Sequence, residues 1–221
     1  MKLALVLPLL MLAAAGCVGP VHAQRFSFSQ PDDSDKEAQA ARDARIASDL
    51  SVPCRADLKN KKIMVVIGER QSNGYIEAHQ QNYGEHYQAI NKRLQALGLR
   101  TYTPEEIRRQ IAQAELDAYF RNDPDAALSA ARRLGASFVL RGLISSQAVG
   151  NPLMAVNQVS INMGFTLTGS NGRVISDTEA SAASYAGSDV HKMALTLVNE
   201  KADEVVAALY ADYCRNAGRS K

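Results

Sequence analysis

The spacing of apolar residues predicts a single α+β domain over residues 53–217. Ile63–Ile67 is a continuous apolar run that ends at Gly68, which is typical of a strand buried on both faces. The next segment carries an apolar stripe at helical spacing, and Gly98 is placed to end that helix. The stripe consists of Tyr83, Tyr87, Ile90, Leu94 and Leu97.

A short strand and two helices are predicted next. Leu99 to Tyr102 has the pattern of a short strand. Thr103-Pro104-Glu105-Glu106 then supplies a helix N-cap, a proline in the first turn and a reciprocal glutamate. A further helix begins at Asp123-Pro124, runs to Leu134 and stops at Gly135.

Three strands and a long helix complete the domain. Phe138–Ile144 is the first strand, and residues 159–167 alternate apolar and polar side chains as a half-buried strand does. Asn171-Gly172 predicts a tight hairpin turn into the third strand, residues 173–185. Ser188 is placed to cap the last helix. The apolar stripe of that helix consists of Leu195, Val198, Ala202, Val205 and Leu209. The order is therefore β-α-(β)-α-α-β-β-β-α, with helices packed on a mixed sheet.

The N-terminus has the pattern of a secretory signal. Lys2 precedes an apolar run from Leu3 to Ala15, which is shorter than the roughly 20 residues that span a bilayer. Two cleavage sites compete. Cleavage after Val21-His22-Ala23 gives a signal peptide of residues 1–23, whereas Ala14-Ala15-Gly16-Cys17 is similar to a lipobox and gives a signal of residues 1–16 with Cys17 acylated. Either form places the protein in the periplasm, and the second tethers it to the outer membrane.

Residues 24–52 are predicted to form a flexible lead that contains a helix. The first part is polar and lacks apolar periodicity. Ser34-Asp35-Lys36-Glu37 then has the spacing of a capping box, and the alanine-rich stretch that follows is helical to about Leu50. Because the apolar face of this helix is mostly alanine, we expect it to dock weakly.

Cys54 and Cys214 predict a disulfide that ties the two ends of the domain together. Both signal cleavages retain the two residues, and the exported protein enters an oxidising compartment. Neither has a second Cys or His at ligand spacing beside it. The formal net charge is +2 and the sequence has no block of basic residues, so we expect no nucleic-acid-binding surface.

The side chains that could carry chemistry do not form a recognisable active site. His79 and His86, with Glu77 and Glu85 nearby, stand seven residues apart, although zinc pairs on helices are usually spaced i, i+4. His191 is expected to make a surface or cap contact. The loop predicted over residues 68–74 matches no phosphate-binding motif, and Ser145-Ser146 has no assignable His and acid partners. We therefore expect no catalytic, cofactor or metal site.

The segment from Ala131 to Ile144 resembles the helix-Gly-Ala-strand-Gly step of the CsgG/LpoB family of bacterial envelope proteins. A hairpin with Thr168-Gly169 and a long final helix follow, and the resemblance covers about residues 61–216. CsgG also has two long amphipathic hairpins, whereas the connection from Ile144 to Val159 is only about a loop long here. This difference favours the type of LpoB, which activates a penicillin-binding protein.

The resemblance implies a non-enzymatic envelope protein that acts through contacts with a protein partner in the periplasm. One alternative is a subunit of an outer-membrane assembly or secretion apparatus, and another is a periplasmic enzyme with an unrecognised site. The sequence leaves the identity of the partner and the oligomeric state open.

Overall fold

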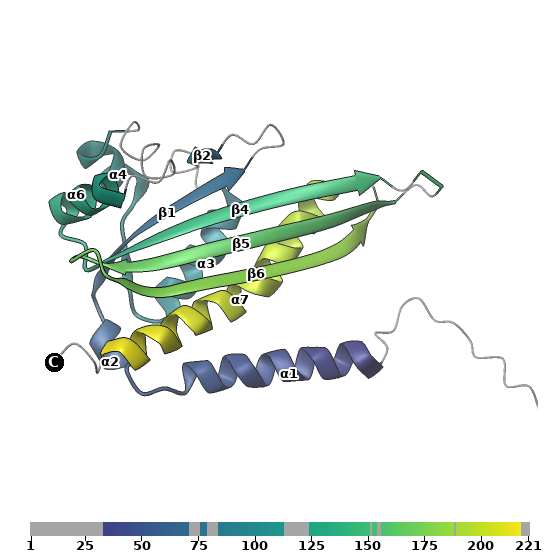
Figure 1. The fold of residues 1–221 in the computed structure, drawn as a ribbon, viewed down its shortest axis with the longest axis horizontal. Coiled ribbons are helices and arrows are strands. Elements are labelled where there is room, and N and C mark those ends of the chain that lie inside the picture. Colours follow the sequence, from purple (N-terminus) through teal and green to yellow (C-terminus); the bar gives the residue numbers. More distant parts are fainter. Residues whose placement is uncertain are drawn as a thin grey trace, which may run out of the picture.

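The computed structural model describes residues 33–70, 76–78, 84–112, 124–150, 152–153, 156–187 and 189–217, and these form an α+β fold around a mixed sheet (Figure 1). The described strands are β1 (Lys62–Arg70), β2 (Ile76–Ala78), β3 (Arg100–Thr101), β4 (Phe138–Gly150), β5 (Asn157–Gly169) and β6 (Val174–Ala186). Their order is β2-β1-β4-β5-β6, and β3 also pairs with β1. β1 runs parallel to β3 and β4, while all other pairs are antiparallel. The predicted fold class is confirmed.

Helices cover both faces of the sheet. The described helices are α1 (Asp33–Leu50), α2 (Arg55–Leu58), α3 (Glu85–Ala96), α4 (Pro104–Gln110), α6 (Pro124–Leu134) and α7 (Val190–Ala217). α3 and α7 pack on one face, α4 and α6 pack over β1 and the start of β4 on the other, and α1 lies along α7 (Figure 1). Alternate residues of β1 therefore enter two cores: Val65 faces α3 and α7, and Val66 faces α4 and α6.

The alternation predicted for β5 is confirmed. Its apolar side chains are buried in the larger core, and the residues between them are half-buried or exposed. The buried set is Val159, Ile161, Met163, Phe165 and Leu167. Phe165 lies beside Gly142 of β4, where a Cβ atom would come within 2.4 Å of the aromatic ring. Gly142 is therefore required by this close packing.

Several predicted helix ends are confirmed by local geometry. Gly98 and Gly135 follow α3 and α6 with positive φ angles of 96° and 65°. At α4 the Glu106 N–H donates to the Thr103 hydroxyl oxygen at 3.2 Å, and the Thr103 N–H donates to the Glu106 carboxylate at 2.8 Å. The expected capping box is thus complete.

The cap of α7 differs from the sequence prediction. Ser188 lies outside the described residues, and the Asp189 carboxylate accepts the Lys192 N–H at 2.9 Å. Asp189 immediately precedes the helix, so it acts as the N-cap. Its negative charge also interacts favourably with the positive end of the helix dipole.

The prediction of a loop between Ile144 and Val159 is wrong. β4 continues to Gly150, β5 begins at Asn157, and the two strands pair without interruption from Phe138–Gly169 to Gly150–Asn157. Residues 146–150 are all exposed, with Val149 as the one large apolar side chain among them, and they show no half-buried alternation. The backbone ladder with β5 holds them in place. The short connection therefore gives no ground for separating the CsgG and LpoB types.

Three smaller differences are also present, and the first two come from pairing between strands. β1 continues through Gly68 to Arg70, because β4 pairs with it along the whole of that segment. β2 forms at residues 76–78, just after the predicted loop of residues 68–74, and it pairs with the last residues of β1. α2 is a single short turn that follows Cys54.

The segment between α1 and β1 contacts the C-terminal end of α7. Cys54 and Cys214 are joined by a disulfide with their Cα atoms 5.8 Å apart. The hydroxyl of buried Tyr210 accepts the Cys54 N–H at 3.3 Å and donates to the Val52 carbonyl. α1 buries none of its residues fully, and its Arg45 lies 3.9 Å from the Glu204 carboxylate of α7.

Candidate interaction surface

Strands β4, β5 and β6 project beyond the end of β1 (Figure 1). Arg70, the last residue of β1, pairs with Ser145, and β4 then continues to Gly150. We call the paired residues 146–150, 157–161 and 182–186 the ribbon end. One face of the ribbon end packs on α7, where Val159 and Ala186 are buried.

The other face of the ribbon end carries exposed apolar side chains. Val149 pairs with Gln158, which in turn pairs with Tyr185, so the three lie in one row across the strands. Val149 is 62% exposed and Tyr185 is 66% exposed. Leu153, in the turn between β4 and β5, is 92% exposed. Apolar side chains gathered at a projecting edge are typical of a protein contact site.

A shallow hollow of about 400 Å³ lies on the same face, nearer to β1. It is centred on Gly164, where a Cβ atom would meet nothing within 4 Å. Arg70 and Glu179 lie on its wall together with small polar side chains. Those polar residues are Ser145, Asn162 and Ser181. The face therefore changes from charged and polar to apolar toward the ribbon end.

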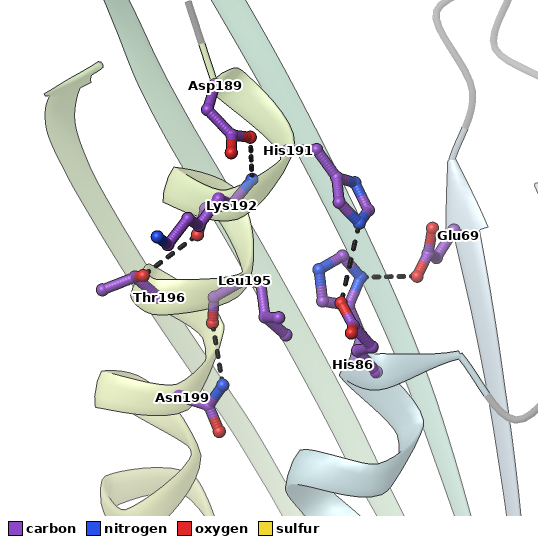
Figure 2. A network of polar contacts seen from close by, with 9 residues as sticks. Glu69, His86, Asp189, His191, Lys192, Leu195, Thr196 and Asn199 are labelled. Atoms are coloured by element: carbon purple, nitrogen blue, oxygen red, sulfur yellow. Dashed lines mark hydrogen bonds and ion pairs between the residues drawn. The ribbon is translucent and has the colours of Figure 1, made fainter. Parts of the chain in front are cut away.

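Below this end of the sheet, a polar cluster joins β1, α3 and α7 (Figure 2). His86 is 6% exposed and its Nδ1 lies 2.6 Å from a carboxylate oxygen of Glu69. The buried Nε2 has no hydrogen-bond partner among the described residues. This arrangement fixes the ring of His86 against the end of β1.

His191 extends the cluster to α7. Its Nε2 lies 3.7 Å from the Glu85 carboxylate, and its ring centroid is 6.1 Å from that of His86. Both His191 and Glu85 have largely exposed side chains, so screening by water keeps this contact weak. The cluster thus links the first turns of α3 and α7, as expected for a surface contact of His191.

The structure brings together only part of the histidine and acid set considered from sequence. His86, Glu85 and His191 are neighbours, while His79 lies outside the described residues and Glu77 is placed only as a backbone position in β2. Within the described ranges, no group of three or more His, Cys, Asp or Glu side chains is arranged to hold a metal.

The other candidates are distributed along the fold. Residues 68–70 belong to β1, and residues 71–74 lie outside the described part. Ser145 and Ser146 are strand residues of β4. Cys17 also lies outside the described chain. A gap of about 20 Å³ inside the larger core is apolar and too small for a ligand.

Sequence reasoning missed the ribbon end. Val149 and Leu153 lie in the segment between Ile144 and Val159, for which the sequence predicts a loop. Gln147-Ala148-Val149 does not alternate polar and apolar residues, so the local pattern gives no strand signal at this point. Among the described helices, none is both long and apolar enough to cross a membrane.

Comparison with known proteins gives distant structural likenesses. No family model matches the chain, and no curated protein matches it. The C-terminal domain of LpoB from Salmonella enterica is 16% identical with a TM-score of 0.39, and the match covers 63% of this chain and 93% of that one. A PelC dodecamer from Paraburkholderia phytofirmans is 17% identical with a TM-score of 0.41, and the match covers 69% of this chain and 88% of that one. The lipoprotein GNA1162 from Neisseria meningitidis is 18% identical with a TM-score of 0.39, and the match covers 64% of this chain and 96% of that one. At these identities and TM-scores, the likenesses assign neither a family nor a function to this chain.

Proposed function

We propose that this protein is a non-enzymatic bacterial envelope protein that acts in the periplasm by binding a protein partner through the ribbon end. The observation that carries the proposal is the exposed apolar group of Val149, Leu153 and Tyr185 on a projecting three-stranded ribbon. Burying such side chains against a partner gains roughly 25 cal/mol per Å² of apolar surface. The backbone ladder holds the ribbon in one shape, which lowers the entropy cost of binding.

The N-terminal sequence supports the location. The apolar run from Leu3 to Ala15 has the length of a secretory signal, and the disulfide between Cys54 and Cys214 suits an oxidising compartment. In this proposal the mature chain begins at Gln24 or at an acylated Cys17. The intact mass of protein purified from whole native cells distinguishes the two forms, because only the second carries lipid.

The sequence resemblance to the CsgG/LpoB family gives the partner its proposed class. An LpoB-type protein would bind an enzyme of cell-wall synthesis and raise its activity without doing chemistry itself. The described residues fit a binding role, because the buried His86 is paired with Glu69 and forms no arrangement with a nucleophile. The alternative, a subunit of an outer-membrane assembly, would use the same surface for copies of this chain.

Co-purification tests the proposal. A triple variant, Val149→Ser with Leu153→Ser and Tyr185→Ser, removes the exposed apolar group and leaves the buried core unchanged. The matched control is Val174→Ser, which changes a residue 56% exposed at the other end of β6. We expect the triple variant to lose an envelope protein that wild type and control retain. Equal recovery with all three proteins would contradict the proposal, and loss of self-association alone would favour the assembly subunit.

A further inference from the structure

A second cleft is lined by residues of the turn between β5 and β6 and of the C-terminal end of α7. These segments lie at the opposite end of the sheet from the ribbon end (Figure 1). The cleft has a volume of about 450 Å³. The walls come from the residues before β1 and β4, from the β5–β6 turn, from α2 and from α7. This cleft is not part of the proposed contact with a protein partner, so we consider separately what it could bind.

Lys61 is held in a fixed position on the wall of the cleft. Its ammonium group donates to the Tyr213 hydroxyl at 2.9 Å. The same nitrogen lies 5.6 Å from the ring centroid of Phe138 and 5.5 Å from that of Tyr213. The two rings meet edge to face, with centroids 5.3 Å apart. An ammonium group beside two aromatic rings is partly shielded from water, which strengthens its attraction for an anion.

The ammonium group of Lys61 retains donors for a ligand. It has three N–H bonds, and the Tyr213 hydroxyl accepts one of them. Among the described residues, no carboxylate lies within ion-pair distance of Lys61. The positive charge of Lys61 is therefore available to a bound anion within the described part of the chain.

The turn between β5 and β6 adds further donors to the cleft. The Asn171 amide oxygen accepts the Arg173 N–H at 3.0 Å, which leaves the Asn171 NH₂ group available. The Ser170 N–H donates to the Ser137 carbonyl at 3.1 Å, so two serines are neighbours on the wall. Arg173 is exposed and adds a second positive charge.

The charges on the walls favour an anion. Lys61 and Arg173 are positive and Asp57 is negative, so the charged lining residues leave a net positive cleft. Oxyanions accept several hydrogen bonds at once from ammonium, guanidinium, amide and hydroxyl groups. We propose that this cleft binds an oxyanion, a carboxylate or phosphate group, with Lys61 as its main ligand-binding residue.

Titration of the full mature chain with two probes tests this site. Sodium succinate represents carboxylates and inorganic phosphate represents phosphates, with amide resonances of Ser170, Asn171 and Gly172 as the readout. We expect saturable shifts of these resonances with at least one probe, and the probe that saturates identifies the anion class. Shifts that do not saturate with either probe would overturn the proposal.

Two neighbouring lysines give a matched pair of variants. Lys61→Met removes the ammonium group from the cleft, whereas Lys62→Met removes one that lies over Tyr102, 5.7 Å from its ring centroid. We expect anion affinity to fall about tenfold in Lys61→Met, the effect of losing one charge-assisted hydrogen bond, and to be unchanged in Lys62→Met. Equal affinity in the two variants would overturn the assignment of Lys61.

Two exposed positions keep the test valid if Lys61→Met folds poorly. Arg173→Gln removes a positive charge and should weaken binding, and Asp57→Asn removes the negative charge and should strengthen it. Opposite directions in these variants support an electrostatic site. An unchanged affinity in both would contradict it, independently of any result at the ribbon end.

Discussion

Gly142 and Gly164 occupy adjacent rows of β4 and β5 but differ in the space around them. A Cβ atom at Gly142 would lie 2.4 Å from the Phe165 ring, whereas one at Gly164 would meet nothing within 4 Å. We expect Gly142→Ala to lower the free energy of unfolding by about 1 to 3 kcal/mol through overpacking, and Gly164→Ala to change it by less than about 0.5 kcal/mol. Urea unfolding of the two variants measures this difference. Equal stabilities would contradict the packing described for β5.

Tyr102 should make stability depend on alkaline pH. Its hydroxyl donates to the Leu134 carbonyl at 2.6 Å. Burial raises the pKa of this hydroxyl, the Glu106 carboxylate raises it further, and Arg100 lowers it. The unfolded chain therefore loses this proton first, so the stabilisation is complete below about pH 10 and is lost as pH rises through the folded pKa.

The comparison of Tyr102→Phe with wild type tests this dependence. We expect the phenylalanine variant to lose less of its free energy of unfolding between neutral pH and strongly alkaline pH. Tyr185→Phe is the control, because its ring is 66% exposed. An identical alkaline decline in wild type and Tyr102→Phe would contradict the account.

At the scale of elements, the sequence predicts those parts of the fold in which local chemistry and the core act together. The capping box at Thr103 and Glu106 forms as expected, because its hydrogen bonds link residues three apart. The alternation in β5 survives because each apolar side chain has a core to enter. β1 was recognisable because both of its faces are buried.

The parts that sequence reasoning missed depend on pairing between distant segments. Ser145 to Gly150 has little apolar pattern, and only the ladder with β5 makes it a strand. β2 exists because its residues pair with the end of β1. The candidate surface was missed for the same reason. Val149 and Tyr185 become neighbours across Gln158 only when three strands are in register.

α1 is expected to open before the rest of the described fold. It buries none of its residues fully, whereas α7 buries residues along its whole length. Segments with few buried contacts have low local opening free energies. Limited trypsin digestion should cleave first at Arg42 or Arg45, which leaves a core that begins at Asp43 or Ile46. First cleavage at Lys201 of α7, whose side chain is 16% exposed, would contradict this order.

At the scale of the whole molecule, the disulfide connects the segment before β1 to the end of α7. It joins cysteines 160 residues apart, and in the chain-entropy model such a closure stabilises by about 5 kcal/mol. We expect Cys214→Ser to lower the melting temperature without changing the fold, and the double variant with Cys54→Ser to lose the same amount. Calorimetry under non-reducing conditions measures both losses. Unchanged stability, or two free thiols in the native protein, would contradict this role.

The central claim is that the ribbon end contacts a protein partner in the envelope. Its most direct test is to place a photo-crosslinking amino acid at Tyr185 in cells that produce the protein, and at Val174 as the control. Both positions are exposed, at 66% and 56%, but they lie at opposite ends of β6. The account predicts one dominant crosslinked envelope protein from position 185 and none from position 174. Crosslinks equally strong at position 174, or absent at position 185, would contradict it.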